Sequence, residues 1–499
     1  MRSFDRRDFL KLSASASASG LLALAALDNP LVAKDKNADK ADGTPSSNDT
    51  LRVAVVGVNG RGMSHVGAFA GNKKMNTVIT HVCDADEGVI GRAMKAIEDK
   101  QKQAPKFEQD IRKLLEDKSI DIVSIATPNH WHALASIWAM QAGKDVYVEK
   151  PVSHNVKEGR MTVEFARNLG KICQTGTQSR STQGMRDAIA FVRSGKIGTV
   201  KLARGLCYKP RGSIGKVDKA TPIGKTCDYN LWCGPAPTSP LMRKRLHYDW
   251  HWAWATGNGD LGNQGIHEMD KARWGLGKME MPKSVVSVGG RLGYVDDGET
   301  ANTQLCFFDY GDAELIFEVR GLKTGKYKEA SVGNVFYGSD GYVVCPSYSS
   351  GIAYDKDGTV LRKFSGGGDE GHFDNFIKAV RARKAEMLNA DILEGHLSSA
   401  LCHLGNISYR LGHTATEQEL VECYGSAGKN PLGLGESGRE TFARLKQHLA
   451  DNHVALTDGL RTGRKLAIDT KTERFVNDKK ADEMLSREYR KGFEVPDKV

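Results

Sequence analysis

The chain has 499 residues, of which 40% are hydrophobic and 26% charged, and its formal net charge is +10. This length exceeds one ordinary hydrophobic core, so we expect at least two domains, and the composition excludes a disordered or fibrous protein. Basic residues are mostly interspersed with acidic ones, and no recognition helix, zinc module or RNA-binding signature is present, which argues against a nucleic-acid partner.

Residues 1–33 are typical of an export signal. Arg6 and Arg7 precede Phe9 and Lys11, as in the twin-arginine signal, and a Ser/Ala run and a short apolar stretch follow. That stretch is much shorter than the ~20 residues that span a bilayer, so we do not expect an integral membrane protein. Twin-arginine export moves folded proteins with their cofactor bound. We therefore predict a periplasmic or other extracytoplasmic location, the twin-arginine translocase as a partner, and a polar linker over 34–50.

From residue 51, apolar strands alternate with helical stretches. We expect strands over 51–56, 78–83, 121–125, 145–148 and 172–175, and helices over 62–71, 87–101, 108–117, 131–142 and 157–169. Right-handed crossovers between such strands build a doubly wound parallel sheet. The predicted fold class is α/β, with an N-terminal Rossmann domain over 51–175.

The pattern changes after residue 175. Longer β-type runs are expected over 200–208, 284–292, 302–309, 313–319, 332–337 and 342–346, with helices over 183–195, 370–384 and 391–411. Several strands with few crossover helices indicate an open, mostly antiparallel sheet. We predict a second, α+β domain over 176–425, and a C-terminal extension over 426–499 that wraps over the body.

A glycine-rich turn ends the first strand. Its residues, similar to a G-x-G-x-x-G pattern with Asn in place of the middle glycine, are Gly57, Asn59, Gly60, Arg61 and Gly62. Glycine lets the backbone approach a pyrophosphate, the helix N-terminus offers free N–H groups, and Asn best tolerates a left-handed backbone. The alternative is a purely structural connection.

Asp84 ends the second strand. A carboxylate there can accept hydrogen bonds from the adenosine ribose hydroxyls and would repel a 2′-phosphate, which favours NAD over NADP. The alternative is an acid that only solubilises a loop.

Polar groups also follow the later strands, at the edge where ligands bind in such folds. We assign Thr127, Asn129, His132, Glu149 and Gln178 to the cofactor site, together with Lys150.

Lys150 and His267 are the candidate acid–base pair. An unpaired buried ammonium is costly, so Lys150 makes sense as a contact of the substrate hydroxyl. Asn263, His267 and Asp270 share one helix face, and histidine suits removal of the hydroxyl proton. The alternatives are a surface lysine at a turn and a core histidine.

Five features follow one another along the chain: the glycine turn, Asp84, Thr-Pro-Asn-x-x-His, Glu-Lys-Pro and the Gly-x-His-x-x-Asp helix. In this order they resemble the glucose–fructose oxidoreductase, inositol dehydrogenase and rhizopine-catabolism (Gfo/Idh/MocA) family over roughly 51–411. The resemblance implies hydride exchange between NAD(P) and a sugar-like substrate, with Lys150 and His267 as catalytic residues. It also implies a homo-dimer or homo-tetramer packed through the open sheet. Many members carry Asp where Asn263 stands; Asn can orient a hydroxyl but cannot raise the basicity of His267.

An insertion over 209–256 is rich in aromatic residues. We predict a carbohydrate-facing wall made of Trp232, His247, Tyr248, Asp249, Trp250, His251, Trp252 and Trp254, with Tyr208, Lys209, Arg211 and Asp270 as further substrate candidates. Aromatic rings pack on the apolar faces of sugar rings. A satellite core or a dimer contact is the alternative.

The nine cysteines show no C-x-x-C pattern and no zinc spacing, so we expect no metal, and pairing of Cys227 with Cys233 stays open.

The leading hypothesis is an NAD-dependent sugar or glycoside oxidoreductase with tightly bound cofactor. A redox-neutral glycosidase or epimerase is the first alternative; in the glycosidase branch the lysine of Glu-Lys-Pro is often missing, so Lys150 favours the dehydrogenase. A non-catalytic nucleotide- or sugar-binding protein is the second.

Overall fold

The computed structural model describes residues 49–425 and 428–499. The chain divides into two units, 1–46 and 47–499, and every described residue belongs to the second. The twin-arginine stretch and nearly all of the expected linker lie outside the described residues. None of the helices in the described part of the chain has the length and apolar character needed to cross a bilayer.

The first domain is a parallel sheet that has six strands among the described residues. Its order is β3-β2-β1-β4-β5-β6, made of β1 (Leu51–Val56), β2 (Thr77–Cys83), β3 (Lys106–Glu108), β4 (Ile122–Ile125), β5 (Asp145–Val148) and β6 (Cys173–Thr175). The order reverses between β1 and β4, which marks the switch point where such sheets bind ligands. The predicted doubly wound sheet is confirmed.

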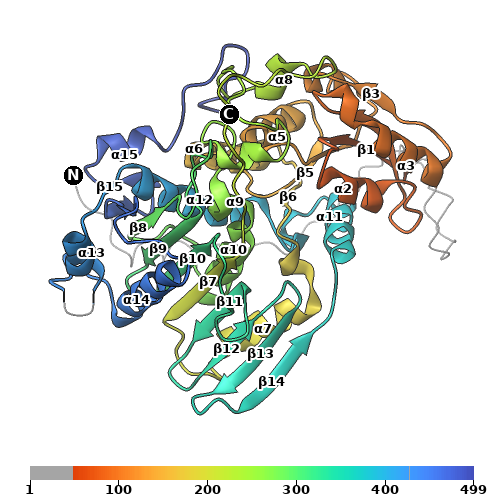
Figure 1. Ribbon diagram of the computed structural model, residues 1–499. Helices are drawn as coiled ribbons and strands as arrows, with labels where there is room; N and C mark the ends of the chain where they lie inside the picture. Colours follow the sequence, from red (N-terminus) through yellow and green to blue (C-terminus); the bar gives the residue numbers. More distant parts are fainter. Residues whose placement is uncertain (1–48, 426–427) are drawn as a thin grey trace, which may run out of the picture. The chain divides into compact units, whose positions relative to one another are not determined.

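Helices cover both faces of this sheet (Figure 1). Side chains of β1 alternate: Ala54 and Val56 pack in the cluster of α5 (His132–Gln141) and α6 (Val156–Asn168). Val53 and Val55 pack in the cluster of α2 (Gly62–Phe69) and α3 (Gly91–Gln101). This alternation is the period of two expected of a strand buried on both faces.

The expected helix over 108–117 is wrong. Lys106–Glu108 instead form β3, which pairs in parallel with His81–Cys83 at the sheet edge, and only a short helix, α4 (Ile111–Leu114), follows. Asp110 caps that helix by accepting a hydrogen bond from the Arg112 N–H. The strand is short and polar because it lies at an exposed edge, so it lacks the apolar pattern by which strands are recognised.

A helix from the second half of the chain also packs on the first sheet. This helix, α11 (Glu370–Ala382), places Phe373 and Phe376 among Val53, Val55 and Tyr147. The rings of Phe373 and Tyr147 are stacked with centroids 4.8 Å apart. The Rossmann core therefore includes a helix beyond residue 175.

The second sheet is open and mostly antiparallel, as predicted. Its main order is β14-β13-β12-β11-β7-β10-β9-β8-β16-β15, and only β7 and β10 are paired in parallel among the strands described. The strands are β7 (Leu202–Tyr208), β8 (Ser284–Gly290), β9 (Thr303–Asp309), β10 (Glu314–Arg320), β11 (Val332–Tyr337), β12 (Gly341–Cys345), β13 (Ser350–Asp355), β14 (Val360–Ser365), β15 (His413–Thr414) and β16 (Arg461–Thr462). One face packs against α7 (Gln183–Arg193), α10 (Gly265–Leu276) and α12 (Ile392–Arg410).

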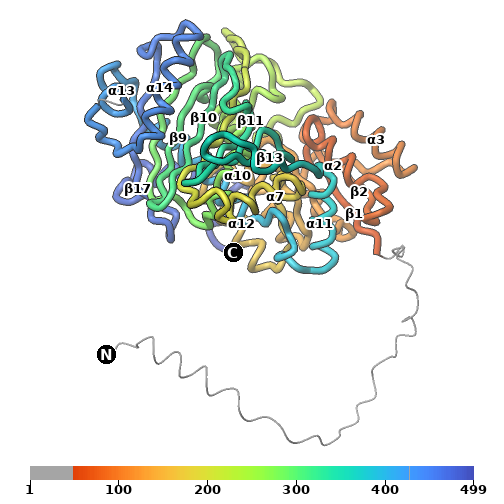
Figure 2. Tube along the Cα trace, turned by 90° about the horizontal axis from the view of Figure 1, so that it is seen from below, coloured from red at the N-terminus to blue at the C-terminus, as the bar shows by residue number. Residues whose placement is uncertain are grey.

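Two helices near the C-terminus pack on the other face of this sheet. Residues of α13 (Glu417–Tyr424) and α14 (Glu436–Asp451) form one apolar cluster with β8, β9 and β10, in which Phe442 and Leu445 meet Val286, Phe307 and Ile316. Figure 2 shows α13 and α14 beside β9 and β10. In the C-terminal extension β17 (Leu466–Asp469) pairs with β8, so this segment is an integral part of the domain.

Candidate functional site

A cavity of about 510 Å³ opens at the carboxyl edge of the first sheet, a volume typical of ligand sites. The Rossmann residues that line it include Gly57, Asn59, Gly60, Arg61, Asp84, Thr127, Asn129, His132, Glu149, Lys150 and Gln178. The second domain adds Trp232, His247, Tyr248, Trp250, His251, Asn263 and His267. All the predicted cofactor-binding residues except Gly62 therefore border one cavity.

The turn after β1 requires glycine at two positions. Gly57 has φ +84°, and a Cβ there would lie 2.8 Å from the Ala126 backbone. A Cβ on Gly62, which lies under the turn, would be 1.9 Å from the Gly57 carbonyl oxygen. Asn59 does not adopt the left-handed conformation that we expected it to tolerate; Gly57 does. The packing thus keeps the backbone bare beside the cavity, as a pyrophosphate needs.

Asp84 is held by backbone N–H groups from two sides. Its Oδ2 accepts a hydrogen bond from Val58 at 2.9 Å and its Oδ1 accepts one from Asp86 at 3.1 Å. Burial raises the pKa of Asp84, against the effect of these hydrogen bonds. Each carboxylate oxygen retains a second lone pair, so the group can still accept hydrogen bonds from ribose hydroxyls.

Several residues around the cavity carry a buried polar atom that lacks a hydrogen-bond partner within the described part of the chain. These atoms are Arg61 Nη2, Thr127 Oγ1, Gln178 Oε1 and His267 Nδ1. Buried polar groups are normally paired, so their gathering here indicates a polar ligand. Together with the bare glycine turn and Asp84, these residues fit a dinucleotide.

Glu149 orients its neighbours, as do His132 and Asn129. Glu149 Oε1 accepts hydrogen bonds from Arg61 Nε at 2.9 Å and His65 Nε2 at 3.1 Å. Burial raises the pKa of Glu149, but the His65 hydrogen bond and the Arg61 charge outweigh it and hold that pKa well below its usual range.

The imidazole ring of His132 and the side-chain amide of Asn129 tie loops together. His132 Nδ1 lies 2.5 Å from the Pro151 carbonyl oxygen and Nε2 lies 2.8 Å from that of Thr127. Asn129 Nδ2 donates to Asn258 Oδ1 at 3.0 Å. We infer that these side chains hold the cavity wall rather than present free polar atoms to it.

Lys150, Asn263 and His267 come together from the two domains. Lys150 Nζ donates a hydrogen bond to the Asn263 carbonyl oxygen at 2.8 Å, and burial lowers the pKa of Lys150. His267 is buried against Tyr348, and burial together with the Lys150 charge holds the pKa of His267 well below its usual range. A neutral imidazole beside an ammonium group can accept a proton from a bound hydroxyl. Asn263 contributes its backbone carbonyl, while its side-chain amide lies 3.5 Å from Asp260 Oδ1.

Three of the predicted substrate residues do not line the cavity: Tyr208, Trp252 and Asp270. The Tyr208 hydroxyl donates to Glu318 at 2.7 Å, and Asp270 is bound by Arg180, with Nε 2.8 Å from Oδ2.

Trp252 is buried too, beneath the guanidinium of Arg211. Arg211 is bound to Asp260 at 2.7 Å and donates to the Tyr248 hydroxyl at 2.9 Å, and Lys209 donates to Gln264 at 3.2 Å. Of these groups, Arg211 contacts a residue of the cavity wall, Tyr248.

The insertion forms one wall of the cavity. Tyr248 adopts a left-handed backbone with φ +69°, and the rings of Trp250 and His251 are stacked with centroids 3.6 Å apart. Burial lowers the pKa of His251 to about 3. Asp249 and Trp254, which the sequence also placed on this wall, are not in it. Cys227 and Cys233 are free thiols, as are the other cysteines among the described residues.

Several lining residues escaped the sequence analysis, among them Gln109, Asp110, Ile111 and Trp131. The first three follow β3, at the strand edge where ligand contacts are expected. Reading 108–117 as a helix hid them, and recognising β3 would have identified them.

Two family models match the chain. "Oxidoreductase family, NAD-binding Rossmann fold" matches residues 51–177 and "Oxidoreductase family, C-terminal alpha/beta domain" matches 197–424. Among curated relatives, glycosyl hydrolase family 109 protein 2 of Shewanella sp. (strain ANA-3) is 36% identical over 180 residues. Alpha-N-acetylgalactosaminidase of Shewanella oneidensis is 31% identical over 188 residues. Each match covers 35% of this chain and only 39% of the relative.

Solved structures share the fold at low identity. Levoglucosan dehydrogenase in complex with NADH and levoglucosan has a TM-score of 0.56 at 17% identity, covering 71% of this chain and 97% of that one. The WlbA dehydrogenase from Bordetella pertussis, in complex with NADH and UDP-GlcNAcA, has a TM-score of 0.53 at 18% identity, covering 71% and 96%. The chain thus belongs to the Gfo/Idh/MocA oxidoreductase family and carries its NAD-binding Rossmann domain.

Proposed function

We propose that the protein transfers a hydride between a secondary hydroxyl of a sugar or glycoside and an NAD molecule that stays bound in the cavity. The observation that carries this proposal is the meeting of Lys150 and His267, from two domains, at the cavity that the glycine turn also borders. Lys150 Nζ is fixed there by the Asn263 carbonyl at 2.8 Å.

NAD, when bound, supplies the hydride acceptor. His267, kept neutral by burial and by the Lys150 charge, takes the proton of the substrate hydroxyl. The Lys150 ammonium group donates a hydrogen bond to the same oxygen and stabilises the negative charge that develops on it. Asn263 holds Lys150 in place through its backbone carbonyl.

A sugar ring suits the other wall of the cavity. Tyr248, Trp250 and Trp232 line it, and flat aromatic side chains pack on the apolar faces of sugar rings while neighbouring polar groups bind hydroxyls. Structural neighbours in complex with levoglucosan and with UDP-GlcNAcA support a carbohydrate substrate.

A redox-neutral glycosidase is the second candidate. The curated relatives named glycosyl hydrolase family 109 protein and alpha-N-acetylgalactosaminidase favour it. In that reaction the same two residues would act on the same hydroxyl, but the hydride would return to the sugar after the glycosidic bond has broken. Lys150 favours the net oxidoreductase.

One experiment separates these functions. The purified protein is denatured to identify its bound nucleotide, and the native protein is then incubated with a panel of sugars and chromogenic glycosides. A net oxidoreductase accumulates reduced-nicotinamide absorbance together with an oxidised sugar. A redox-neutral glycosidase releases the aglycone without a lasting change in that absorbance. Bound sugar with neither signal would make the protein a non-catalytic binding protein.

We also propose export through the twin-arginine translocase, which the Arg6-Arg7 pair supports. Replacing both with lysine should leave the protein in the cytoplasm, because the translocase reads the guanidinium pair. Fractionation of cells that express the two forms tests this, and equal extracytoplasmic yields would refute it.

A further inference from the structure

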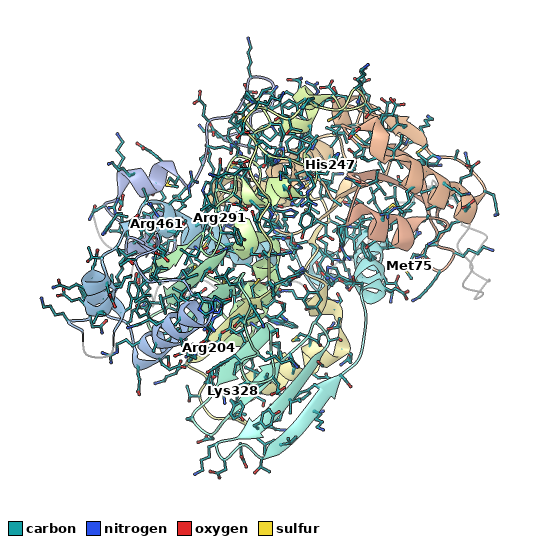
Figure 3. The ribbon with its side chains drawn as sticks, viewed as in Figure 1. Met75, Arg204, His247, Arg291, Lys328 and Arg461 are labelled. Atoms are coloured by element: carbon teal, nitrogen blue, oxygen red, sulfur yellow. The ribbon has the colours of Figure 1, made fainter. Side chains whose placement is uncertain are left out.

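The loop after β2 is fastened to the insertion, which comes about 140 residues later in the chain. Asp86 is the centre of this contact: Thr226 Oγ1 donates to its Oδ1 at 2.7 Å, and His247 Nε2 lies 2.9 Å from its Oδ2. His247 is marked in Figure 3. We call Asp86, Thr226, Cys227 and His247 the clasp.

The backbone reinforces the clasp. Glu87 N–H donates to the Thr226 carbonyl at 3.1 Å and Asp228 N–H donates to the Ala85 carbonyl at 2.9 Å, which makes Asp86 and Cys227 direct partners in an antiparallel bridge. Gln109 Nε2 donates to both carbonyls, at 2.9 Å to Ala85 and 3.2 Å to Thr226. Two segments far apart in sequence are therefore joined by side-chain and backbone hydrogen bonds together.

The clasp stands at the wall of the cavity, beside the carboxylate predicted to bind ribose. Asp84, Ala85, Gln109 and His247 all line the cavity, and Asp84 Oδ1 accepts the Asp86 N–H. Beyond His247 the insertion continues to Tyr248, whose hydroxyl is held by Arg211. Arg211, itself in the insertion, is bound at 2.7 Å to Asp260, which lies beyond the insertion in the second domain. The insertion is thus fastened both at the Rossmann edge and in the second domain, with the cavity between.

We propose that the clasp retains NAD, which leaves only after Asp86 has parted from Thr226 and His247. This inference rests on the proposed function, in which NAD stays bound through turnover. A retained cofactor must be returned to its starting state in place, either by the same substrate or by a second one that enters the same cavity.

The rate of NADH release tests the clasp without measuring turnover. The full-length protein is loaded with NADH and chased with excess NAD, and release is followed as the loss of energy transfer from tryptophan; Trp232 and Trp250 line the cavity. Asp86→Asn and His247→Gln should each release NADH roughly tenfold faster or more, the effect of losing one good hydrogen bond to a charged group. The double variant should release NADH no faster than the faster single variant, because both substitutions break the same contact between Asp86 and His247.

A matched control is His413→Gln. His413 forms a similar hydrogen bond with Glu419 at 2.8 Å, on β15, and does not line the cavity. Its release rate should equal that of the wild type.

An engineered disulfide, which can be formed and reduced, keeps the test decisive if those variants fold poorly. Directly paired residues of an antiparallel bridge have the separation that a disulfide needs. Asp86→Cys should therefore form a disulfide with the native Cys227, slow NADH release below the wild-type rate when oxidised, and release faster than wild type after reduction. The double variant Asp86→Cys, Cys227→Ser should not respond to reductant.

If the protein binds NADH but all variants, oxidised or reduced, release it at the wild-type rate, the clasp is refuted and the proposed function stands. If the protein takes up no NADH, both are refuted.

Discussion

Lys150→Met removes the ammonium group from the site while leaving the length of the side chain nearly unchanged. Lys150 is partly buried, and its Nζ is held by the Asn263 carbonyl. Water is therefore poorly placed to stabilise the substrate oxygen once the ammonium group has been removed. One hydrogen bond to a charged group is worth ~1.5–3 kcal/mol, which corresponds to a loss of roughly 10- to 150-fold in turnover. His267→Ala removes the proton acceptor, and such groups contribute ~10²–10⁴-fold.

The assay has two readings on each variant. Bound nucleotide, released by denaturation, should equal that of the wild type, because neither side chain holds the pyrophosphate. The rate at which bound NAD is reduced by the identified substrate should fall by the factors above. The double variant should be little worse than the poorer single variant, since the two groups act on one hydroxyl.

Lys278→Met is the matched control. Lys278 also forms an ion pair, with Asp312 at 2.6 Å, but does not line the cavity, so its turnover should be unchanged. Full activity in both Lys150→Met and His267→Ala would refute the assignment of the site. Loss of nucleotide together with activity would make the two residues structural rather than chemical.

Three further predictions follow from the geometry. Asp84→Ala should narrow the preference for NAD over NADP in binding titrations, and equal wild-type affinity for both would contradict the role of the carboxylate. Burial lowers the pKa of His130 and His403 to about 3, against about 6.5 for histidine in the unfolded chain. Below pH 6.5 the unfolded chain therefore binds more protons than the folded one. The free energy of unfolding should fall progressively with pH, by about 2 kcal/mol for each of the two histidines at pH 5. Urea unfolding at pH 7 and pH 5 measures this, and equal stabilities would refute it. Phe442→Ala should destabilise the protein by ~3–5 kcal/mol, because its ring is buried between α14 and the second sheet; an unchanged melting temperature would show that α14 is not held there.

The fold was predictable where apolar runs are long. Strands such as β1 and β4 are rich in Val and Ile because helices bury both of their faces. β3 and β14 were missed for the opposite reason: each lies at a sheet edge, and β14 is exposed at five of its six positions. The packing of α11 on the first sheet could not be foreseen, because an amphipathic helix does not specify which sheet it covers.

The site was predictable where one short sequence motif carries both the local backbone structure and the polar or reactive group. The glycine turn, Lys150 and His267 are such cases. Asp270 shows the limit: it lies one turn after His267 on α10, yet it is buried against Arg180 and Ser398 rather than the cavity. The contacts of Asp86 with Thr226 and His247 join positions far apart in sequence, and spacing along the chain carries no information about such pairs.

The helix α14 has a consequence for synthesis of the chain. The apolar side chains of β8, β9 and β10 that it covers are made long before it, so during translation they remain exposed until the C-terminal segment has left the ribosome. Exposed apolar surface of this kind binds chaperones or other chains. A premature stop codon that deletes only the last helices would therefore act like a mutation in the hydrophobic core, although every residue of the cavity would still be made.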